Sequence, residues 1–191
     1  MSTPKLKAFI QQFHPISDEE WAFFCSRLQQ TQLPAKQKLI TAGQVENHVH
    51  FIEHGLVRYY IEKDDKDITF EIAFENGFAC GYDSFLTRTP ILYSGEALVD
   101  TVLWSITYED LQEVYAHSRV GDKIGRLAAE RLYLRKNMRQ MSLLQDTAEQ
   151  RYIRLLEDQL QFVQTIPLKY LASYIGITPQ ALSRIRKRIS R

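Results

Sequence analysis

The stretch of sequence that decides the fold lies near its end: Leu168-Lys-Tyr-Leu-Ala-Ser-Tyr-Ile-Gly-Ile-Thr-Pro-Gln-Ala-Leu-Ser-Arg-Ile-Arg-Lys187. Its apolar residues fall at helical spacing on both sides of Gly176, which predicts two short helices joined by a tight turn. Such a turn needs positive φ, which only glycine adopts cheaply. Ala172 is small enough to let two helices cross closely. The pattern therefore predicts a helix-turn-helix.

The second helix of this pair has an explicit start and two distinct faces. Thr178 is a favoured N-cap residue, and Pro179 suits the first helical position. Helical spacing predicts a buried face formed by Leu182, Ile185 and Ile189. The opposite face is polar and then basic, as expected of a helix that enters the major groove. We expect the DNA contacts to come from Thr178, Gln180, Ala181, Ser183, Arg184, Lys187 and Arg188.

Each polar residue type on this face matches a group on DNA. Glutamine can pair with N6 and N7 of adenine, and arginine with O6 and N7 of guanine. We predict that Arg184 contacts a base. We predict that Lys187, Arg188 and Thr178 contact phosphates, which set the register and the salt dependence of binding. The alternative is an ordinary amphipathic helix hairpin whose basic face is only solvated.

The charge distribution favours a nucleic-acid partner for this end of the chain. The whole chain has a net charge of only +1. From Gln159 onward there is no acidic residue, and the basic residues are Lys169, Arg184, Arg186, Lys187, Arg188 and Arg191. The first 158 residues hold 18 basic and 23 acidic side chains. An acidic body with a basic end is typical of a protein in which one small domain meets phosphate.

Other classes of protein find no support in the sequence. No run approaches the roughly 18 apolar residues that span a bilayer, and the start lacks a signal-peptide pattern, so we expect a cytoplasmic protein that contacts no membrane. Cys25 and Cys80 have no CxxC spacing, and we expect both to be reduced. The acidic turn at 63–67 is interpreted as solvated charge. Without a nucleophile and base pair or a phosphate loop, we do not expect an enzyme.

The middle of the chain predicts a small antiparallel β domain. Between about Pro34 and Tyr108 the hydrophobic period changes to two, and we expect strands at 38–40, 48–53, 56–61, 68–74 and 97–103. Turn residues recur at intervals of roughly ten to twelve, which suits a barrel or jelly roll. Ahead of this domain, Ser17 and Glu20 form a capping box that predicts a short helix.

The last part of the chain is predicted to be helical. Residues 108–116 predict a short helix and 120–141 a long one. The residues that come close to heptad spacing in the long helix are Ile124, Leu127, Ala128, Leu132, Tyr133, Arg135 and Met138. Such a stripe is typical of a coiled-coil seam between two copies; the alternative is that the helix only packs on its own β domain. Thr147 and Gln150 form a capping box for a further helix, and we expect the hinge at 142–146.

Four segments resemble the Crp/Fnr family of bacterial transcription regulators. Two lie in the tail, at 166–187 and at Thr147-Ala-Glu-Gln-Arg-Tyr-Ile-Arg-Leu-Leu156. Two lie upstream, at Phe51-Ile-Glu-His-Gly-Leu-Val-Arg-Tyr-Tyr60 and Glu96-Ala-Leu-Val-Asp-Thr-Val-Leu103. The resemblance covers almost the whole chain. It implies an α+β fold with an antiparallel β-barrel or jelly-roll sensor domain at 1–117, a dimerisation helix at 118–141 and a winged helix-turn-helix domain at 142–191.

The same resemblance implies partners for the chain. Members of the family act as homodimers on palindromic operators in double-stranded DNA, and RNA polymerase becomes a candidate partner. Because the chain stops soon after the second helix of the pair, we expect any wing strands to be shortened or lost.

The resemblance predicts an effector site that lacks its usual phosphate contacts. Nucleotide-binding members carry a Gly-Glu pair and then an Arg-Ser or Arg-Thr pair. The corresponding stretches here are Phe78-Ala-Cys-Gly-Tyr-Asp-Ser-Phe85 and Ile91-Leu-Tyr-Ser-Gly-Glu-Ala97, which lack the Gly-Glu pair and any arginine beside Ser94. A phosphate without its arginine loses charge-assisted hydrogen bonds, so we expect cyclic AMP binding to be weak or absent. The effector is unknown, and the candidate binding residues are Tyr82, Ser84, Arg88 and Ser94.

No metal or cofactor is predicted. The cluster-forming cysteines of the oxygen-sensing branch of the family are missing. The best histidine spacing is His48-x-His50, which on alternate strand positions indicates surface residues rather than metal ligands.

The main hypothesis is therefore a dimeric DNA-binding regulator. The alternative is a small-molecule sensor whose tail contacts a protein instead of DNA. The two differ in salt dependence, because only DNA binding, which releases counterions, weakens steeply as the salt concentration rises.

Overall fold

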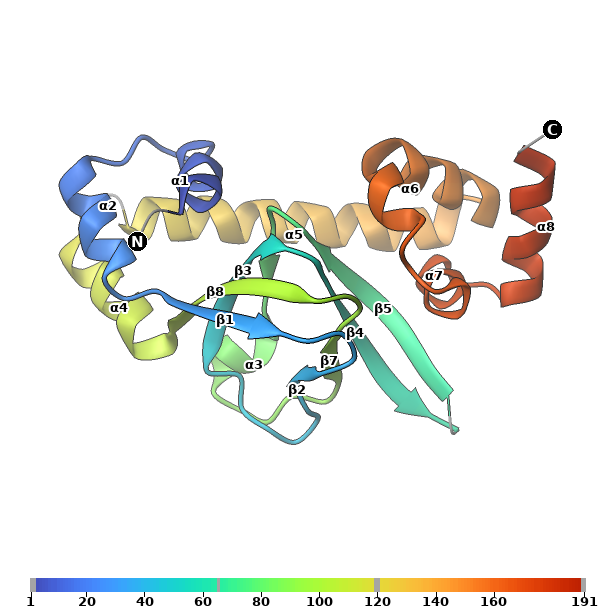
Figure 1. Ribbon diagram of the computed structural model, residues 1–191, viewed down its shortest axis with the longest axis horizontal. Coiled ribbons are helices and arrows are strands. Elements are labelled where there is room, and N and C mark those ends of the chain that lie inside the picture. The colour runs from blue at the N-terminus through green and yellow to red at the C-terminus, as the bar shows by residue number, and fades with distance from the viewer. Residues whose placement is uncertain (1–2, 65, 119–120, 190–191) are drawn as a thin grey trace. The chain divides into compact units, whose positions relative to one another are not determined.

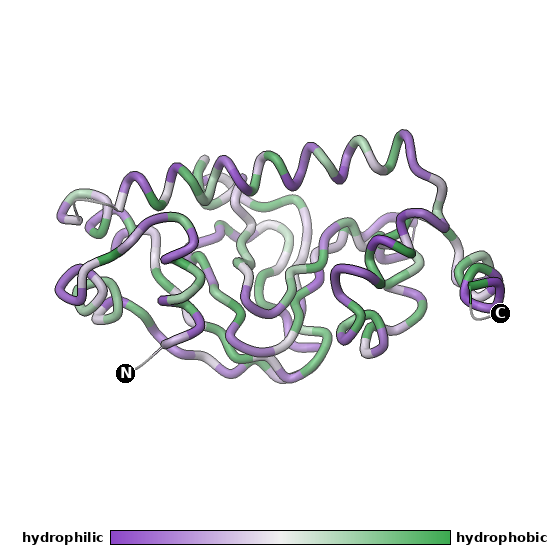
Figure 2. Tube along the Cα trace, turned by 90° about the horizontal axis from the view of Figure 1, so that it is seen from above, coloured by the Kyte–Doolittle hydropathy of each residue, from purple (hydrophilic) through white to green (hydrophobic). Residues whose placement is uncertain are grey.

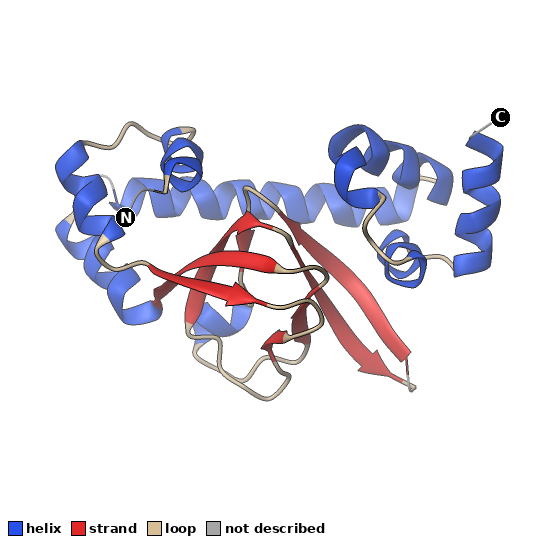
Figure 3. Ribbon diagram, in the orientation of Figure 1, coloured by secondary structure: helices blue, strands red, loops and turns tan. Residues whose placement is uncertain are grey.

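The computed structural model describes residues 3–64, 66–118 and 121–189. The described residues divide into two compact units. The first unit comprises residues 1–58 and 73–132, and the second comprises 59–72 and 133–191. Strands occupy the middle of the chain and helices follow without interruption (Figure 3).

The strands form two four-stranded sheets rather than one closed barrel. Their bounds are β1 Gln29–Leu33, β2 Lys38–Ile40, β3 His48–His54, β4 Leu56–Lys63, β5 Lys66–Phe74, β6 Phe78–Ala79, β7 Ser94–Ala97 and β8 Thr101–Thr107. One sheet has the order β1-β8-β3-β6 and the other β2-β7-β4-β5 (Figure 1). In the first sheet β3 pairs antiparallel with β8, with Phe51 opposite Trp104. The expected jelly-roll type of α+β domain is thus realised as a sandwich of two sheets.

Eight helices are described in the chain. Their bounds are α1 Pro4–Gln11, α2 Asp18–Cys25, α3 Tyr82–Thr87, α4 Tyr108–His117, α5 Gly121–Gln145, α6 Ala148–Val163, α7 Leu168–Ile175 and α8 Pro179–Ile189. Both predicted capping boxes are present. The Ser17 side chain accepts from the Glu20 amide at the start of α2, and Thr147 accepts from the Gln150 amide at the start of α6.

The sequence pattern missed α1, although this helix completes the core of the first unit. Pro4 starts it at the first turn, and Leu6 and Ile10, one turn apart, are 1% and 4% exposed. Both pack with Phe51 and Trp104 of the sheet. The helix was missed because lysines lie between its apolar residues and because its buried face consists of only two residues.

Two expected segments differ from the structure, and one strand was missed. The predicted strand 97–103 contains the end of β7, a turn and the start of β8, because the apolar run Ala97-Leu-Val99 continues into the turn. The polar edge strand β1 was not predicted, since four of its five side chains are exposed. The expected hinge at 142–146 is mostly helical, because α5 continues to Gln145 and only Asp146 and Thr147 separate it from α6. Val120, the predicted start of the long helix, lies outside the described residues.

Gly55, between β3 and β4, provides a test of this packing. It has φ +100°, and a Cβ at this position would lie 2.4 Å from Thr101 Oγ1 and 2.8 Å from Thr101 Cα. Gly43 has a similar φ of +92°, but a Cβ there meets nothing within 4 Å. We expect Gly43→Ala to cost about 1–2 kcal/mol of unfolding free energy from backbone strain alone. Gly55→Ala should cost roughly 2–5 kcal/mol, because an overpacking penalty is added.

Urea unfolding of both variants, followed by circular dichroism, measures the difference. Equal losses in the two variants would contradict the close approach of Thr101 to Gly55.

Candidate nucleic-acid interface

The turn between α7 and α8 has the backbone conformation that the sequence predicts. Gly176 has φ 87° in the left-handed region, and its amide donates to the carbonyl of Ala172 at 2.9 Å. The Ile177 amide donates to the same carbonyl at 3.0 Å. Ala172 is fully buried. Residues 176–178 therefore turn the chain between the two helices, which cross at a large angle (Figure 1).

Thr178 caps α8 as expected. Its Oγ1 accepts a hydrogen bond from the Ala181 amide at 3.2 Å, and its carbonyl accepts from the Leu182 amide at 3.1 Å. Because the capping interaction uses only a lone pair of the hydroxyl, its proton stays available to a phosphate oxygen.

The faces of α8 are close to those predicted. Leu182 and Ile185 are 0% and 7% exposed and face inward. Ile189 is 37% exposed, so its predicted burial is wrong. It is the last described residue of α8, beyond the part of the helix that packs on its neighbours. Of the predicted contact residues, Ala181 and Ser183 are half-buried, and the exposed ones are Thr178, Gln180, Arg184, Lys187 and Arg188. Arg191 lies outside the described residues.

One of the exposed cations already has an acidic partner. Arg188 Nε donates to Glu149 Oε1 at 3.1 Å, and its Nη2 contacts Glu149 Oε2. The hydrogen bond and charge of Glu149 raise the pKa of the Arg188 guanidinium. Glu149 lies in the first turn of α6, where the helix dipole favours a carboxylate. This pair was not predicted, because it joins residues distant in sequence.

Arg151 of α6 fixes the ends of two helices and was also missed. Its Nε donates to the carbonyl of Ile175, the last residue of α7, at 2.8 Å. Its Nη1 donates to the carbonyl of Asp146 at 2.5 Å, just beyond the end of α5. Helix ends leave carbonyls without intrahelical partners, and a cation satisfies them well. Arg151 therefore positions α7 against α6 and α5.

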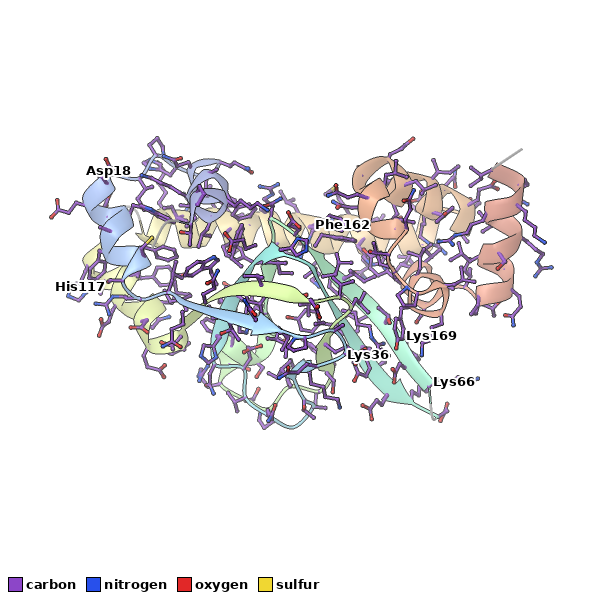
Figure 4. The ribbon with its side chains drawn as sticks, viewed as in Figure 1. Asp18, Lys36, Lys66, His117, Phe162 and Lys169 are labelled. Carbon is purple, nitrogen blue, oxygen red and sulfur yellow. The ribbon has the colours of Figure 1, made fainter. Side chains whose placement is uncertain are left out.

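The β4–β5 hairpin of the same unit contacts α7 and α5. The Thr69 amide donates to Ser173 Oγ at 2.9 Å, and Lys136 Nζ donates to Glu71 Oε2 at 2.5 Å. Arg139 stacks on Tyr174 with its guanidinium carbon 3.8 Å from the ring centre. Figure 4 shows the side chains of this unit and labels Lys66 on the hairpin and Lys169 on α7.

The candidate effector residues are occupied by bonds within the protein. Ser84 Oγ donates to the Thr89 carbonyl at 2.5 Å and accepts from the Glu46 amide at 3.0 Å. Arg88 donates to the Glu46 carbonyl at 2.7 Å and to Asn47 Oδ1 at 2.5 Å. Ser84 and Arg88 thus meet around residue 46, and their polar groups hold the protein's own backbone.

The other two candidates contact other parts of the protein. Ser94 is buried, and its Oγ accepts from the Ala42 amide at 3.2 Å. Tyr82 is half-buried at the start of α3, where its ring stacks on Phe85 with centroids 6.2 Å apart.

A buried ion pair lies on two strands of the sandwich and was not predicted. Arg58 of β4 is 1% exposed, and its Nε donates to Glu96 Oε1 of β7 at 2.7 Å. Beside Ser94, Tyr93 donates to Asp83 Oδ1 at 2.5 Å. Burial, together with this hydrogen bond, raises the pKa of the Tyr93 phenol. It stays a neutral donor at physiological pH.

Of the two histidines predicted to lie on the surface, His48 and His50, one is buried. His50 is 7% exposed, because β3 is an interior strand of its sheet, and its Nδ1 lies 2.7 Å from Ser105 Oγ. His48 is half-buried, and the two rings stack with centroids 5.6 Å apart. His117 is exposed at the end of α4 (Figure 4). The surface interpretation of His48-x-His50 is therefore wrong for His50.

Comparison with known protein families gives a match over part of the chain. Residues 30–118 match the family described as the cyclic nucleotide-binding domain. No curated protein sequence matches the chain. None of the described helices is both long and apolar enough to cross a lipid bilayer.

Solved structures share the fold over most of the chain. The catabolite activator protein of Thermus thermophilus is 19% identical, with a TM-score of 0.58 over 93% of this chain and 85% of its own. The c-di-GMP-responsive global regulator CLP of Xanthomonas campestris is 17% identical, with a TM-score of 0.66 over 91% and 92%. FixK2 of Bradyrhizobium japonicum is 17% identical, with a TM-score of 0.69 over 85% and 84%. The resemblance to Crp/Fnr regulators is confirmed at the level of the fold.

Replacing Arg151 tests how α7 is held. We expect Arg151→Met to lower the unfolding free energy by about 1.5–3 kcal/mol, the usual contribution of a hydrogen bond to a charged group. Arg154→Met is the control, because Arg154 is more exposed and pairs with the Asp146 side chain at 3.0 Å. An exposed pair of this kind contributes about 0–1 kcal/mol. Thermal unfolding by calorimetry separates the two, and equal effects would show that Arg151 does not position α7.

Proposed function

We propose that this chain, which carries a cyclic nucleotide-binding domain and has the fold of Crp/Fnr transcription regulators, binds DNA in a sequence-specific manner through α8. In this proposal α7 and α8 are a helix-turn-helix, and the chain acts as a homodimer on a palindromic operator. The division into a sensor domain at 1–117, a dimerisation helix at 118–141 and a DNA-binding domain at 142–191 is part of the same proposal. RNA polymerase remains a candidate partner.

The exposed face of α8 is the observation that carries the proposal. Gln180, Arg184 and Lys187 are exposed one helical turn apart, opposite the buried Leu182 and Ile185. No acidic residue occurs in α8. Such a face can enter a major groove without charge repulsion, with its first turns reading base edges and its last turn reaching phosphates.

Two groups on this face support different kinds of contact. Arg184 has an exposed guanidinium whose planar fork matches O6 and N7 of guanine, and Gln180 one turn earlier matches adenine. The N-terminus of α8 carries a partial positive charge that favours a phosphate group. The Thr178 hydroxyl at this end of the helix can donate a hydrogen bond to the same phosphate backbone.

Exposed apolar residues on α5 support the homodimer. Met138 and Met141 are 64% and 41% exposed, and Leu134, one turn before them, is 57% exposed. Hydrophobic and hydrophilic residues alternate along this helix (Figure 2). Spacings of four and three residues are typical of a seam that a second helix covers. Earlier in the helix, Ile124 packs on the core of its own domain, so the seam is confined to the later turns.

The contacts of Arg88 support the proposal that cyclic AMP binds weakly or not at all. A bound cyclic phosphate needs a donor such as arginine, but the Arg88 guanidinium donates to Glu46 and Asn47 and lies 4.4 Å from the Tyr108 ring centre. Binding would first require these contacts to break.

Substitutions in α8 test the proposal. We expect Arg184→Ala to weaken binding to a preferred duplex by about 1–3 kcal/mol, roughly 5- to 150-fold, and to relax the preference at one base position. Lys187→Ala should weaken binding to all sequences alike and flatten the slope of log K against log salt by about 0.9 for each phosphate that the variant no longer neutralises. Fluorescence anisotropy with single-base variants of the duplex measures both. An unchanged base preference in Arg184→Ala, or salt-independent binding of the wild type, would favour a tail that contacts protein.

Substitution of Glu149 is expected to strengthen DNA binding, in contrast to the substitutions in α8. Because its carboxylate holds Arg188, Glu149→Gln should release a cation for phosphate and strengthen DNA binding, with a steeper salt dependence. Glu157→Gln on the same helix removes the same charge without releasing Arg188 and serves as the control. An equal gain in both variants would mean that only net charge matters.

A further inference from the structure

We propose that Glu46, His48 and His50 form a binding site for a divalent transition-metal ion such as zinc. The three residues lie at the start of β3 and just before it, and each offers a ligand atom. These atoms all lie within 4.8 Å of one another. Two imidazole nitrogens and one carboxylate oxygen make a set of protein ligands found in zinc sites that keep a position open for water.

The distances require only a small contraction. Ligand atoms bound to a tetrahedral zinc ion at about 2.0–2.2 Å are about 3.3 Å apart. His50 Nε2 and Glu46 Oε1 are separated by 3.8 Å. His48 is the most exposed of the three residues, and a change in its side-chain torsion angles can bring its ring nitrogen closer to the other two ligand atoms.

Hydrogen bonding prepares His50 for an ion. Its Nδ1 lies 2.7 Å from Ser105 Oγ, so an Nδ1 proton donated to this hydroxyl leaves the Nε2 lone pair facing Glu46. A lone pair and a carboxylate repel each other unless a cation lies between them. In histidines that bind metals, a hydrogen bond from the other ring nitrogen fixes the orientation of the ring in this way.

The Glu46 carboxylate is buried and anchored. Glu46 is 3% exposed, and its oxygens accept from the His48 amide at 3.1 Å and from the Gly81 amide at 3.3 Å. These two hydrogen bonds hold the carboxylate beside the His50 ring, with Glu46 Oε1 3.8 Å from His50 Nε2.

The site lies beside a pocket and next to α3. A pocket lined by Leu39, Ile40 and residues 44–48 reaches Glu46 and His48. The backbone of Glu46 is hydrogen-bonded to Ser84 within α3 and to Arg88 at the C-terminal end of this helix. An ion would therefore link β3 to α3, next to the candidate effector residues.

Zinc titration of the full chain in the absence of DNA tests the site. After treatment with a chelator, calorimetry with zinc chloride should show one ion bound per chain, and cobalt(II) should give the absorption bands of a low-coordinate complex. Ser105→Ala should weaken binding by about 10- to 100-fold, the usual effect of losing a hydrogen bond to a ligand. His48→Gln removes a ligand itself and should weaken binding by more than that.

His54→Gln is the matched control. His54 lies on the same strand, is 69% exposed and contacts Glu75 instead, so its variant should bind zinc like the wild type. Circular dichroism of the metal-free variants shows whether each is folded. Stoichiometric binding lost in His48→Gln and kept in His54→Gln supports the site. Absence of binding by folded wild type, or equal loss in both variants, would overturn it and leave a proton between Glu46 and His50. Because no DNA is present, the result is independent of the proposed regulator function.

Discussion

Gly176 turns the chain in a left-handed conformation, and the carbonyl of Ala172, a residue with no exposed surface, accepts the hydrogen bonds of the turn. This close junction of α7 and α8 is the constraint on which the candidate interface depends. It sets which side of α8 packs through Leu182 and which side carries Arg184. A residue with a side chain at 176 would incur the strain of positive φ, whereas the space around its Cβ, with the nearest atoms 3.8 Å away, would accept it.

Hydrogen bonds from elements outside the helix pair also hold α7 in place. Arg151 ties the last carbonyl of α7 to the end of α5, and Thr69 on the β4–β5 hairpin bonds to Ser173 on α7. The long helix and the hairpin therefore both contact the element that supports α8. A change in either one therefore has a physical route to the exposed face of α8.

Sequence reasoning succeeded where the signal is local. Capping boxes, the Gly176 turn and the strand 38–40 depend on residues close in the chain, and all are present. It failed where tertiary contacts decide. The edge strand β1 is polar because it faces solvent, and α1 is recognisable only by what it covers. Likewise, the Arg188 contact with Glu149 and the burial of His50 arise from pairings across the fold that no spacing encodes.

The central claim is that two copies of α8 read DNA together, and selection of bound sequences from a random duplex pool tests it most directly. The account predicts enrichment of a two-fold symmetric site whose half-sites are about one helical turn, roughly 10 base pairs, or a multiple of it apart. Recovery of DNA should fall steeply between low and physiological salt. Absence of any enriched sequence, or enrichment of a single unpaired half-site, would contradict the account.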